Sequence, residues 1–201
     1  NNAAKLFYTS DGKFSVPLTI RLIIGRGWGQ GPNHSQALQS LYAHIPGLKV
    51  VSPSDPNNAY NLLISSIFDN NPVIFLEHRW LHNQEGTLKK NIKKIKLLEK
   101  VSDGKDLTIV SNSIMTVEAI KANEILKKNN ISCDIINLLS LNPIDFKRII
   151  KSVEKTGKLI MLDIDHGHIS VSSEVISYLV SYNKNIFKKE PIKISLPNFP
   201  T

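Results

Sequence analysis

The residues best suited to chemistry lie in one glycine-rich stretch, residues 25–36, which reads GRGWGQGPNHSQ. Glycine occupies the alternate positions 25, 27, 29 and 31, so the backbone there can adopt positive φ angles and approach a ligand closely. His34 follows these glycines, and a neutral imidazole can both donate and accept a proton near neutral pH. The stretch therefore predicts a ligand-binding loop that presents His34 as a general acid or base.

Two phosphate-binding loops fit this stretch poorly. A P-loop ends in Gly-Lys-Ser/Thr, whereas this loop ends in Pro-Asn-His-Ser. A dinucleotide fingerprint needs its third glycine where Gln30 stands. It also needs a carboxylate closing the next strand, where the sequence reads Val51-Ser52-Pro53. The P-loop is excluded, and dinucleotide binding is disfavoured.

The elements around the loop predict where it lies in the fold. An apolar run over 16–24 is expected to be a strand before the loop, and a helix is expected over about 34–44 after it. A helix start supplies free N–H groups and the positive end of a dipole. Because the carboxyl edge of a parallel sheet is a favoured binding location, we expect the loop to lie at such an edge.

Alternating apolar and amphipathic segments predict the α/β class along most of the chain. Asp55 is a plausible N-cap with Pro56 at the first helical position. Strand–helix alternation implies mainly parallel sheets with right-handed crossovers, in two tandem domains. The expected further strands are 48–51, 72–76, 107–110, 133–138, 159–162 and 192–196, and the expected further helices begin near 55, 115, 145 and 172.

Composition narrows the function classes. The 201 residues include 25 Lys+Arg and 17 Asp+Glu, a formal charge of +8, yet only four of the basic residues are arginine. Seven lysines fall between Lys89 and Lys105 without interleaved aromatic residues, which favours a solvated linker over a nucleic-acid surface. No apolar run approaches the roughly 18 residues of a membrane span. The single cysteine, Cys133, is expected in the core of a protein from a reducing compartment.

Several segments together resemble one family. GQGPNHSQ, HIPGLKVVSPSDPNNA and DNNPVIFLEHRWL are similar to the β subunit of the thiamine-diphosphate-dependent 2-oxo acid dehydrogenases, the E1 component of the transketolase-like superfamily. The similarity continues through DLTIVSNS, NLLSLNPID and GKLIMLD and covers nearly the whole chain apart from the lysine-rich linker. The resemblance implies the C-terminal half of a pyrimidine-binding domain over 1–85, a linker over 86–103, and a transketolase C-terminal domain over 104–201.

The resemblance also implies an activity and an assembly. The family's members form α2β2 heterotetramers in which thiamine diphosphate with magnesium is held mainly by the α subunit. They decarboxylate a 2-oxo acid such as pyruvate and reductively acylate the lipoyl group of an E2 partner, an EC 1.2.4-type reaction. Expected partners are therefore an E1 α subunit, a second β subunit and lipoyl-bearing E2, with no nucleic acid or membrane. The expected compartment is the bacterial cytoplasm, or the mitochondrial or plastid matrix of a eukaryote.

Site residues carry over from the resemblance position by position. His34 matches the family's active-site histidine, whereas the glutamate that activates the cofactor would lie upstream of Asn1. A potassium site made mainly of main-chain carbonyls is implied, although the same residues also suit a plain helix end before Pro72. The potassium positions are Leu18, Ser66, Ile67, Asp69 and Asn71.

Both ends of the chain look cut, so we expect a fragment that is inactive in isolation. Two alternatives stay open. One is a transketolase-like thiamine-diphosphate enzyme of a biosynthetic pathway that works without E2. The other is a non-catalytic assembly module whose C-terminal domain serves subunit contacts.

Overall fold

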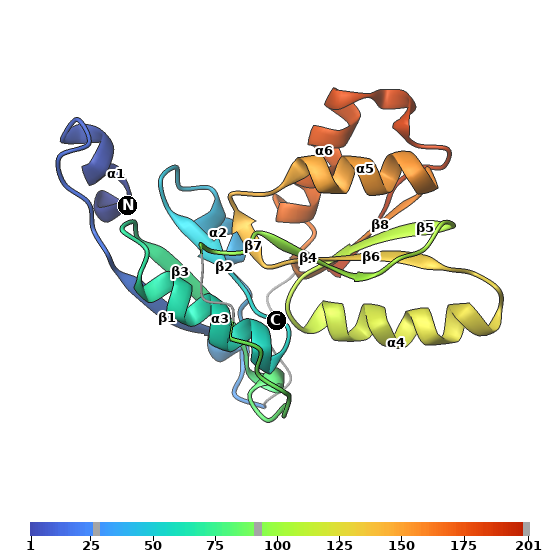
Figure 1. Cartoon of the computed structure of the whole chain (residues 1–201), viewed down its shortest axis with the longest axis horizontal. Helices are drawn as coiled ribbons and strands as arrows, with labels where there is room; N and C mark the ends of the chain where they lie inside the picture. The colour runs from blue at the N-terminus through green and yellow to red at the C-terminus, as the bar shows by residue number, and fades with distance from the viewer. Residues whose placement is uncertain (26–28, 91–93, 199–201) are drawn as a thin grey trace. The chain divides into compact units, whose positions relative to one another are not determined.

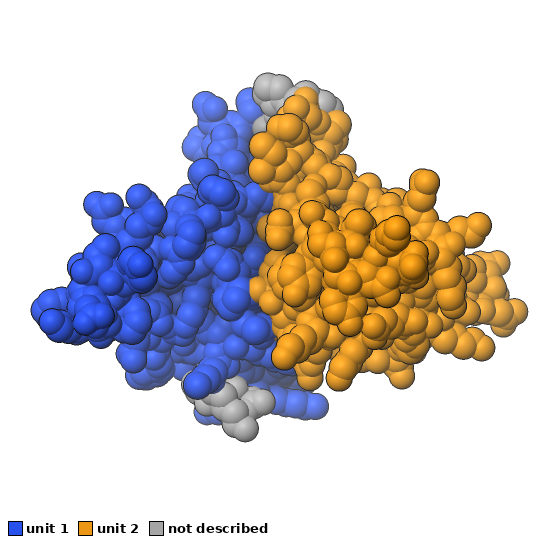
Figure 2. All heavy atoms as spheres, turned by 90° about the horizontal axis from the view of Figure 1, so that it is seen from above, with its two compact units in different colours: residues 1–97, 139–143, 201 blue, residues 98–138, 144–200 orange. Residues whose placement is uncertain are grey.

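The chain folds into two compact units, one formed mainly by residues 1–97 with 139–143 and the other by 98–138 with 144–200 (Figure 2). The computed structural model describes residues 1–25, 29–90 and 94–198. Within this described part, no helix is both long and apolar enough to cross a membrane.

The first unit is built on a sheet whose described strands run in the order β1-β3-β2-β7 (Figure 1). β1, β3 and β2 are parallel, and β7 pairs with β2 in the antiparallel sense. The elements are α1 (Asn2–Thr9), β1 (Thr19–Ile24), α2 (Gln39–Ala43), β2 (Lys49–Val51), α3 (Pro56–Ile67), β3 (Val73–His78) and β7 (Ser140–Asn142).

The core of the first unit lies between the sheet and α3. Asp55 caps this helix, because its carboxylate accepts the backbone N–H of Asn58 at 2.7 Å. Leu62 of α3 packs against buried side chains of the sheet strands and of the residue that precedes β7. Those core partners are Val51, Val73, Phe75 and Leu139. The N-cap expected at Asp55 is confirmed.

The second unit contains a sheet whose described strands run in the order β4-β6-β5-β8-β9. β4 is antiparallel to β6, and the other neighbours are parallel. Figure 1 shows α4 below this sheet and α5 with α6 above it. The elements are β4 (Leu98–Ser102), β5 (Leu107–Ser111), α4 (Ile114–Lys128), β6 (Cys133–Leu138), α5 (Phe146–Thr156), β8 (Leu159–His166), α6 (Val171–Tyr182) and β9 (Ile192–Leu196).

β6 is buried on both faces, and its alternating side chains serve the two faces differently. Cys133 and Ile135 belong to an apolar cluster that includes Ala119 of α4. Asp134 faces the opposite way, where it accepts a hydrogen bond from the hydroxyl of Ser152 in α5 at 2.8 Å. Cys133 is 1% exposed, which confirms its expected place in the core.

The α/β class and the two mainly parallel sheets expected from the sequence are confirmed, but two expected features differ and one strand was not expected. The helix expected over 34–44 is wrong, because α2 begins only at Gln39. The expected linker over 86–103 contains β4 (Leu98–Ser102), a lysine-bearing strand at the sheet edge. β7 is only three residues long, too short for its pattern to predict a strand.

Candidate functional site

The glycine-rich loop leaves the carboxyl end of β1, as the sequence predicts. Gly25 has a φ of +101°, and its N–H donates to the carbonyl of Gln36 at 3.0 Å, which closes the base of the loop. Gly29 and Gly31 also have positive φ angles, +71° and +77°. These values are accessible to glycine at little steric cost. Gly27, with residues 26 and 28, lies outside the described residues.

His34 ends a single 3-10 turn rather than opening a helix. The turn, Pro32–His34, is closed by the N–H of His34, which donates to the Gly31 carbonyl at 3.2 Å. The hydroxyl of Ser35 donates to the same carbonyl at 2.8 Å, and the residue at the N-cap of the next helix is Leu38 instead of Ser35. His34 is exposed. The argument from a helix dipole therefore fails at His34, while its exposure leaves the imidazole accessible.

His34 lines a pocket of about 290 Å³ beside the end of β1. Three polar side chains of the same loop, those of Gln30, Asn33 and Gln36, line it with His34. Apolar side chains from β1 and α2 and one arginine complete the wall, and no carboxylate is among the lining residues of the described chain. The apolar and arginine side chains are those of Leu22, Ile23, Ile24, Leu38, Tyr42 and Arg79. Such a pocket suits a small anionic molecule that needs a proton donor or acceptor.

His78 lies directly behind the base of the loop and was missed by the sequence analysis, which ended this strand at Leu76. Ile24 and His78 are paired in the β1–β3 register, so the residue after Ile24 meets the His78 ring. A Cβ added at Gly25 would lie 2.2 Å from Nε2 of His78. No local sequence pattern singles out this histidine, because the pairing of β1 with β3 joins residues far apart in the chain.

Burial keeps the His78 imidazole neutral. The side chain is 4% exposed, and its Nδ1 accepts the backbone N–H of Trp80 at 3.3 Å. Burial, with a smaller contribution from the charge of His82, lowers the pKa of His78 from 6.5 to about 4. The ring is therefore uncharged at neutral pH and lies directly beneath the loop.

The five residues expected at a potassium site lie at the opposite edge of the same sheet. The carbonyl of Leu18 accepts the N–H of Val73 at 2.8 Å, which brings the start of β1 beside the α3–β3 connection. The N–H of Asn71 donates to the carboxylate of Asp69 at 2.9 Å, so α3 does not continue through it and the carbonyl of Ile67 is left without its helical partner. The carbonyl of Ser66, in contrast, accepts the N–H of Asp69 at 3.2 Å.

A lysine lies close to these carbonyls. The ammonium of Lys49 is 2.5 Å from the Asp69 carboxylate. Burial acts to raise the pKa of Asp69, but the hydrogen bonds from Lys49 and Asn71 outweigh it, so this pKa lies below its usual range. A monovalent cation there would depend on main-chain oxygens, since the carboxylate is already paired.

Two more histidines, His166 at the end of β8 and His168 in the loop after it, lie in a segment whose polar groups serve the fold. Nδ1 of His166 lies 2.8 Å from the carbonyl of Pro197, and the carboxylate of Asp163 accepts the N–H of Ser172 at 3.2 Å. Across the described ranges, no group of three or more His, Cys, Asp or Glu residues could hold a metal ion.

With the fold and the loop in view, two domain families match this chain. The transketolase pyrimidine binding domain matches residues 1–84, and the transketolase C-terminal domain matches residues 97–200. The chain therefore belongs to the transketolase family.

Individual relatives are more specific. The chain is 40% identical over 177 residues to the acetoin:2,6-dichlorophenolindophenol oxidoreductase subunit beta of Cupriavidus necator, which covers 87% of this chain and 52% of that protein. It is 37% identical over 203 residues to the pyruvate dehydrogenase E1 component subunit beta of Gracilaria tenuistipitata var. liui, covering 100% of this chain and 63% of the relative. The pyruvate dehydrogenase E1 component subunit beta of Bacillus subtilis is 36% identical, and the match covers 87% of this chain and 54% of that protein. The chain thus spans between half and two thirds of these relatives.

A solved structure agrees on the fold. A split-gene transketolase, described as an inactive beta4 tetramer, superposes with a TM-score of 0.74. The match covers 98% of this chain and 63% of that chain at 20% identity, so it supports the fold alone.

The contact between Gly25 and His78 predicts an asymmetry between two loop glycines. Gly29 has a φ of +71°, so replacing it with alanine costs about 1–2 kcal/mol in backbone strain. An added Cβ there meets nothing within 4 Å, so no steric clash adds to this cost. Gly25→Ala adds a clash with His78 and is expected to cost about 1–3 kcal/mol more. Chemical denaturation of the two variants measures the difference. Equal losses would mean that the contact does not constrain the loop.

The neutral state of His78 predicts a stability change with pH. Its folded pKa is depressed to about 4, so between pH 4 and 6.5 the unfolded chain binds more protons and stability falls as the pH falls. The full loss is about 3 kcal/mol. We expect His78→Asn to flatten this dependence in urea unfolding at pH 4.5 and 7, and the exposed-residue control His44→Gln to leave it. An unchanged slope in His78→Asn would contradict the assignment.

Proposed function

We propose that this chain forms part of the β subunit of a thiamine-diphosphate-dependent 2-oxo acid dehydrogenase E1. The observation that carries the proposal is the exposed His34 on a glycine loop, lining a pocket with an arginine and no lining carboxylate among the described residues. A 2-oxo acid is a small anion whose conversion requires proton transfer. The named relatives, two of which are E1 β subunits of pyruvate dehydrogenase, support the same class.

Thiamine diphosphate when bound would supply the nucleophilic carbon and the electron sink for decarboxylation. Among the described residues, no group of three or more His, Cys, Asp or Glu side chains could hold a metal ion, and no carboxylate lines the pocket. We therefore propose that an α subunit holds the diphosphate with magnesium, and that the activating glutamate belongs to sequence upstream of Asn1. On this proposal, the isolated chain has no turnover.

His34 is proposed to bind the substrate carboxylate or carbonyl and to donate a proton either to the substrate or to the lipoyl sulfur that is released when the dithiolane S–S bond breaks. The His34 side chain is exposed and lines the pocket, so a substrate in the pocket can reach it. Gln30, Asn33 and Gln36 can orient a polar substrate around it. Leu22, Ile23 and Ile24 of β1 form an apolar part of the pocket wall. These residues bind, orient and move a proton, and the reacting carbon is supplied from outside this chain.

The substrate is the open part of this proposal, and acetoin is a second candidate beside pyruvate. The Cupriavidus necator relative, named for acetoin, is 40% identical, slightly above the 37% and 36% of the pyruvate dehydrogenase subunits. Assays of the complete enzyme with each substrate separate the two. The proposed partners are an E1 α subunit, a second β subunit and a lipoyl-bearing E2, in the bacterial cytoplasm or an organelle matrix.

The proposed role of His34 predicts a split between turnover and cofactor binding. In the complete complex, His34→Ala is expected to lower kcat about 10²–10⁴-fold, the usual contribution of a general acid or base. The affinity for thiamine diphosphate should stay within about twofold, because His34 is assigned to the substrate rather than the cofactor. His44→Ala, an exposed histidine outside the pocket lining, is the control. A matching loss of cofactor affinity would make His34 a cofactor-site residue.

We also propose that the carbonyls of Leu18, Ser66 and Ile67, with Asp69 and Asn71, hold potassium. A bound cation at several times its Kd stabilises a fold by about 1 kcal/mol. Replacing potassium by choline at constant ionic strength should therefore lower the unfolding midpoint. Asp69→Ala should abolish this response, because the α3–β3 turn loses the side-chain oxygen that accepts the Asn71 N–H. Equal midpoints in the two salts would contradict the site.

A further inference from the structure

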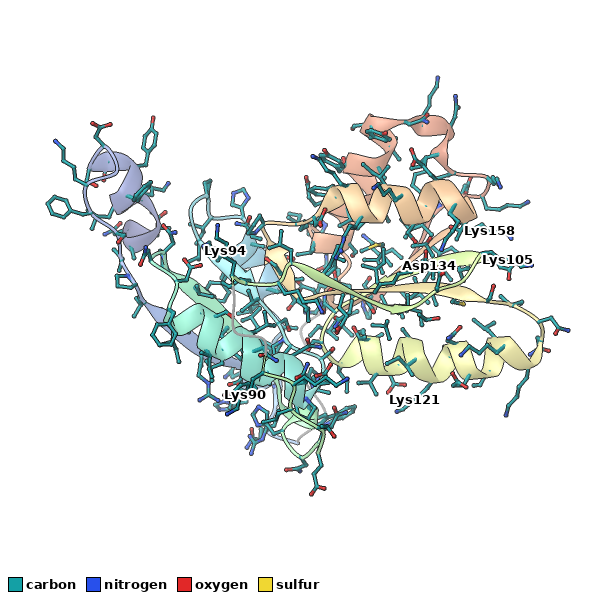
Figure 3. The ribbon with its side chains drawn as sticks, in the orientation of Figure 1. Lys90, Lys94, Lys105, Lys121, Asp134 and Lys158 are labelled. Atoms are coloured by element: carbon teal, nitrogen blue, oxygen red, sulfur yellow. The ribbon has the colours of Figure 1, made fainter. Side chains whose placement is uncertain are left out.

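A second pocket, of about 290 Å³, lies in the second unit between the edge of the sheet and α5. Each of three elements contributes one stripe of side chains. Lys100 of β4 and Asp134 of β6 come from the sheet, and Arg148, Lys151 and Lys155 come from successive turns of α5. The alternation of a strand and the three- and four-residue spacing of a helix place these groups around one cavity. Figure 3 labels Asp134 between the sheet and α5.

Two of the four cations in this pocket are tied to carboxylates. The ammonium of Lys155 lies 2.5 Å from Oδ2 of Asp134 and 2.7 Å from Oδ1 of Asp103. The ammonium of Lys100 lies 2.6 Å from Asp103 and 3.3 Å from Oδ1 of Asp134. Hydrogen bonds from both lysines lower the pKa of Asp103 to about 2, so it stays ionised at neutral pH. Lys100, Lys155 and their two carboxylates therefore form a neutral cluster.

The other two cations are not neutralised. In the described part of the chain, no carboxylate lies within ion-pair distance of the Arg148 guanidinium or the Lys151 ammonium. Both residues are exposed and stand one helical turn apart on α5. The pocket thus has an excess of two positive charges. Its wall also includes the apolar side chains of Leu98 and Ile136, which are buried in the sheet.

We propose that this pocket binds a small molecule carrying a phosphate group, through Arg148 and Lys151. A phosphate monoester at neutral pH has close to two negative charges, which matches the excess. The guanidinium presents paired N–H donors that fit two phosphate oxygens, and the lysine adds a point charge. The apolar residues provide a surface for a short organic part. The volume is at the lower end of ligand pockets, so the ligand is small.

The test uses the 201-residue chain, with inorganic phosphate and methyl phosphate as probes and acetate as the comparison anion. Isothermal titration calorimetry at constant ionic strength measures affinity, and amide spectra show whether β4 and α5 respond. Arg148→Gln/Lys151→Gln should weaken phosphate binding about tenfold or more. The matched control is Lys121→Gln/Lys127→Gln, which removes the same charge from α4, whose Lys121 points away from the sheet (Figure 3).

A third variant predicts the opposite sign. Asp103 is exposed, so Asp103→Asn should fold normally while releasing both clustered lysines from one of their two carboxylates. Phosphate affinity should then rise about threefold or more, because the local positive charge increases. Three results would each overturn the proposal: no phosphate binding by the unmodified chain, equal weakening in the control, or acetate binding as tightly as phosphate.

Discussion

The close approach of Gly25 to the ring of His78 is the constraint on which the geometry of the first unit's site depends. β1 and β3 are parallel and in register, with Ile24 opposite His78, so the two strands end side by side. Gly25, the residue after β1, must pass close to the imidazole of His78. A Cβ on this residue would lie only 2.2 Å from Nε2 of that ring, so the position requires glycine. The direction in which the loop leaves the sheet follows from that turn, and with it the position of His34.

The neutrality of His78 is as important as its shape. A charged imidazole in that buried position would have to be solvated or paired, and either change would move the loop that rests on it. The charge of His82 lowers the pKa of His78 further instead of stabilising the charged ring. The His78 ring therefore adds no charge beneath the loop, and the charged side chain among the described residues that line the pocket of His34 is that of Arg79.

The sequence predicts those parts of the fold whose pattern is local. β6 and β9 match the expected 133–138 and 192–196, because apolar runs between turn residues define them. β4 was missed because its five residues, LEKVS, lie at the end of a lysine-rich segment and form no continuous apolar run. Its pairing with β6 is also a long-range contact. The loop and His34 could be singled out from glycine spacing. His78 could not, because its role depends on the β1–β3 register, which no local pattern encodes.

The two units treat a buried titratable group in opposite ways, and this difference accounts for part of the positive charge around the pocket of the second unit. His78 is made neutral by burial, which needs no counter-charge nearby. Asp134, 1% exposed, instead has two lysines at its oxygens, and those lysines also need Asp103. Loss of the cationic partner of a buried carboxylate destabilises the folded state by about 3–5 kcal/mol. Asp134 therefore requires Lys100 on the neighbouring strand and Lys155 on the helix. Arg148 and Lys151 extend that helix face beyond the charge that Asp134 requires. The stability of the carboxylate accounts for the first two cations of the pocket, whereas the other two need a different reason, which an anionic ligand supplies.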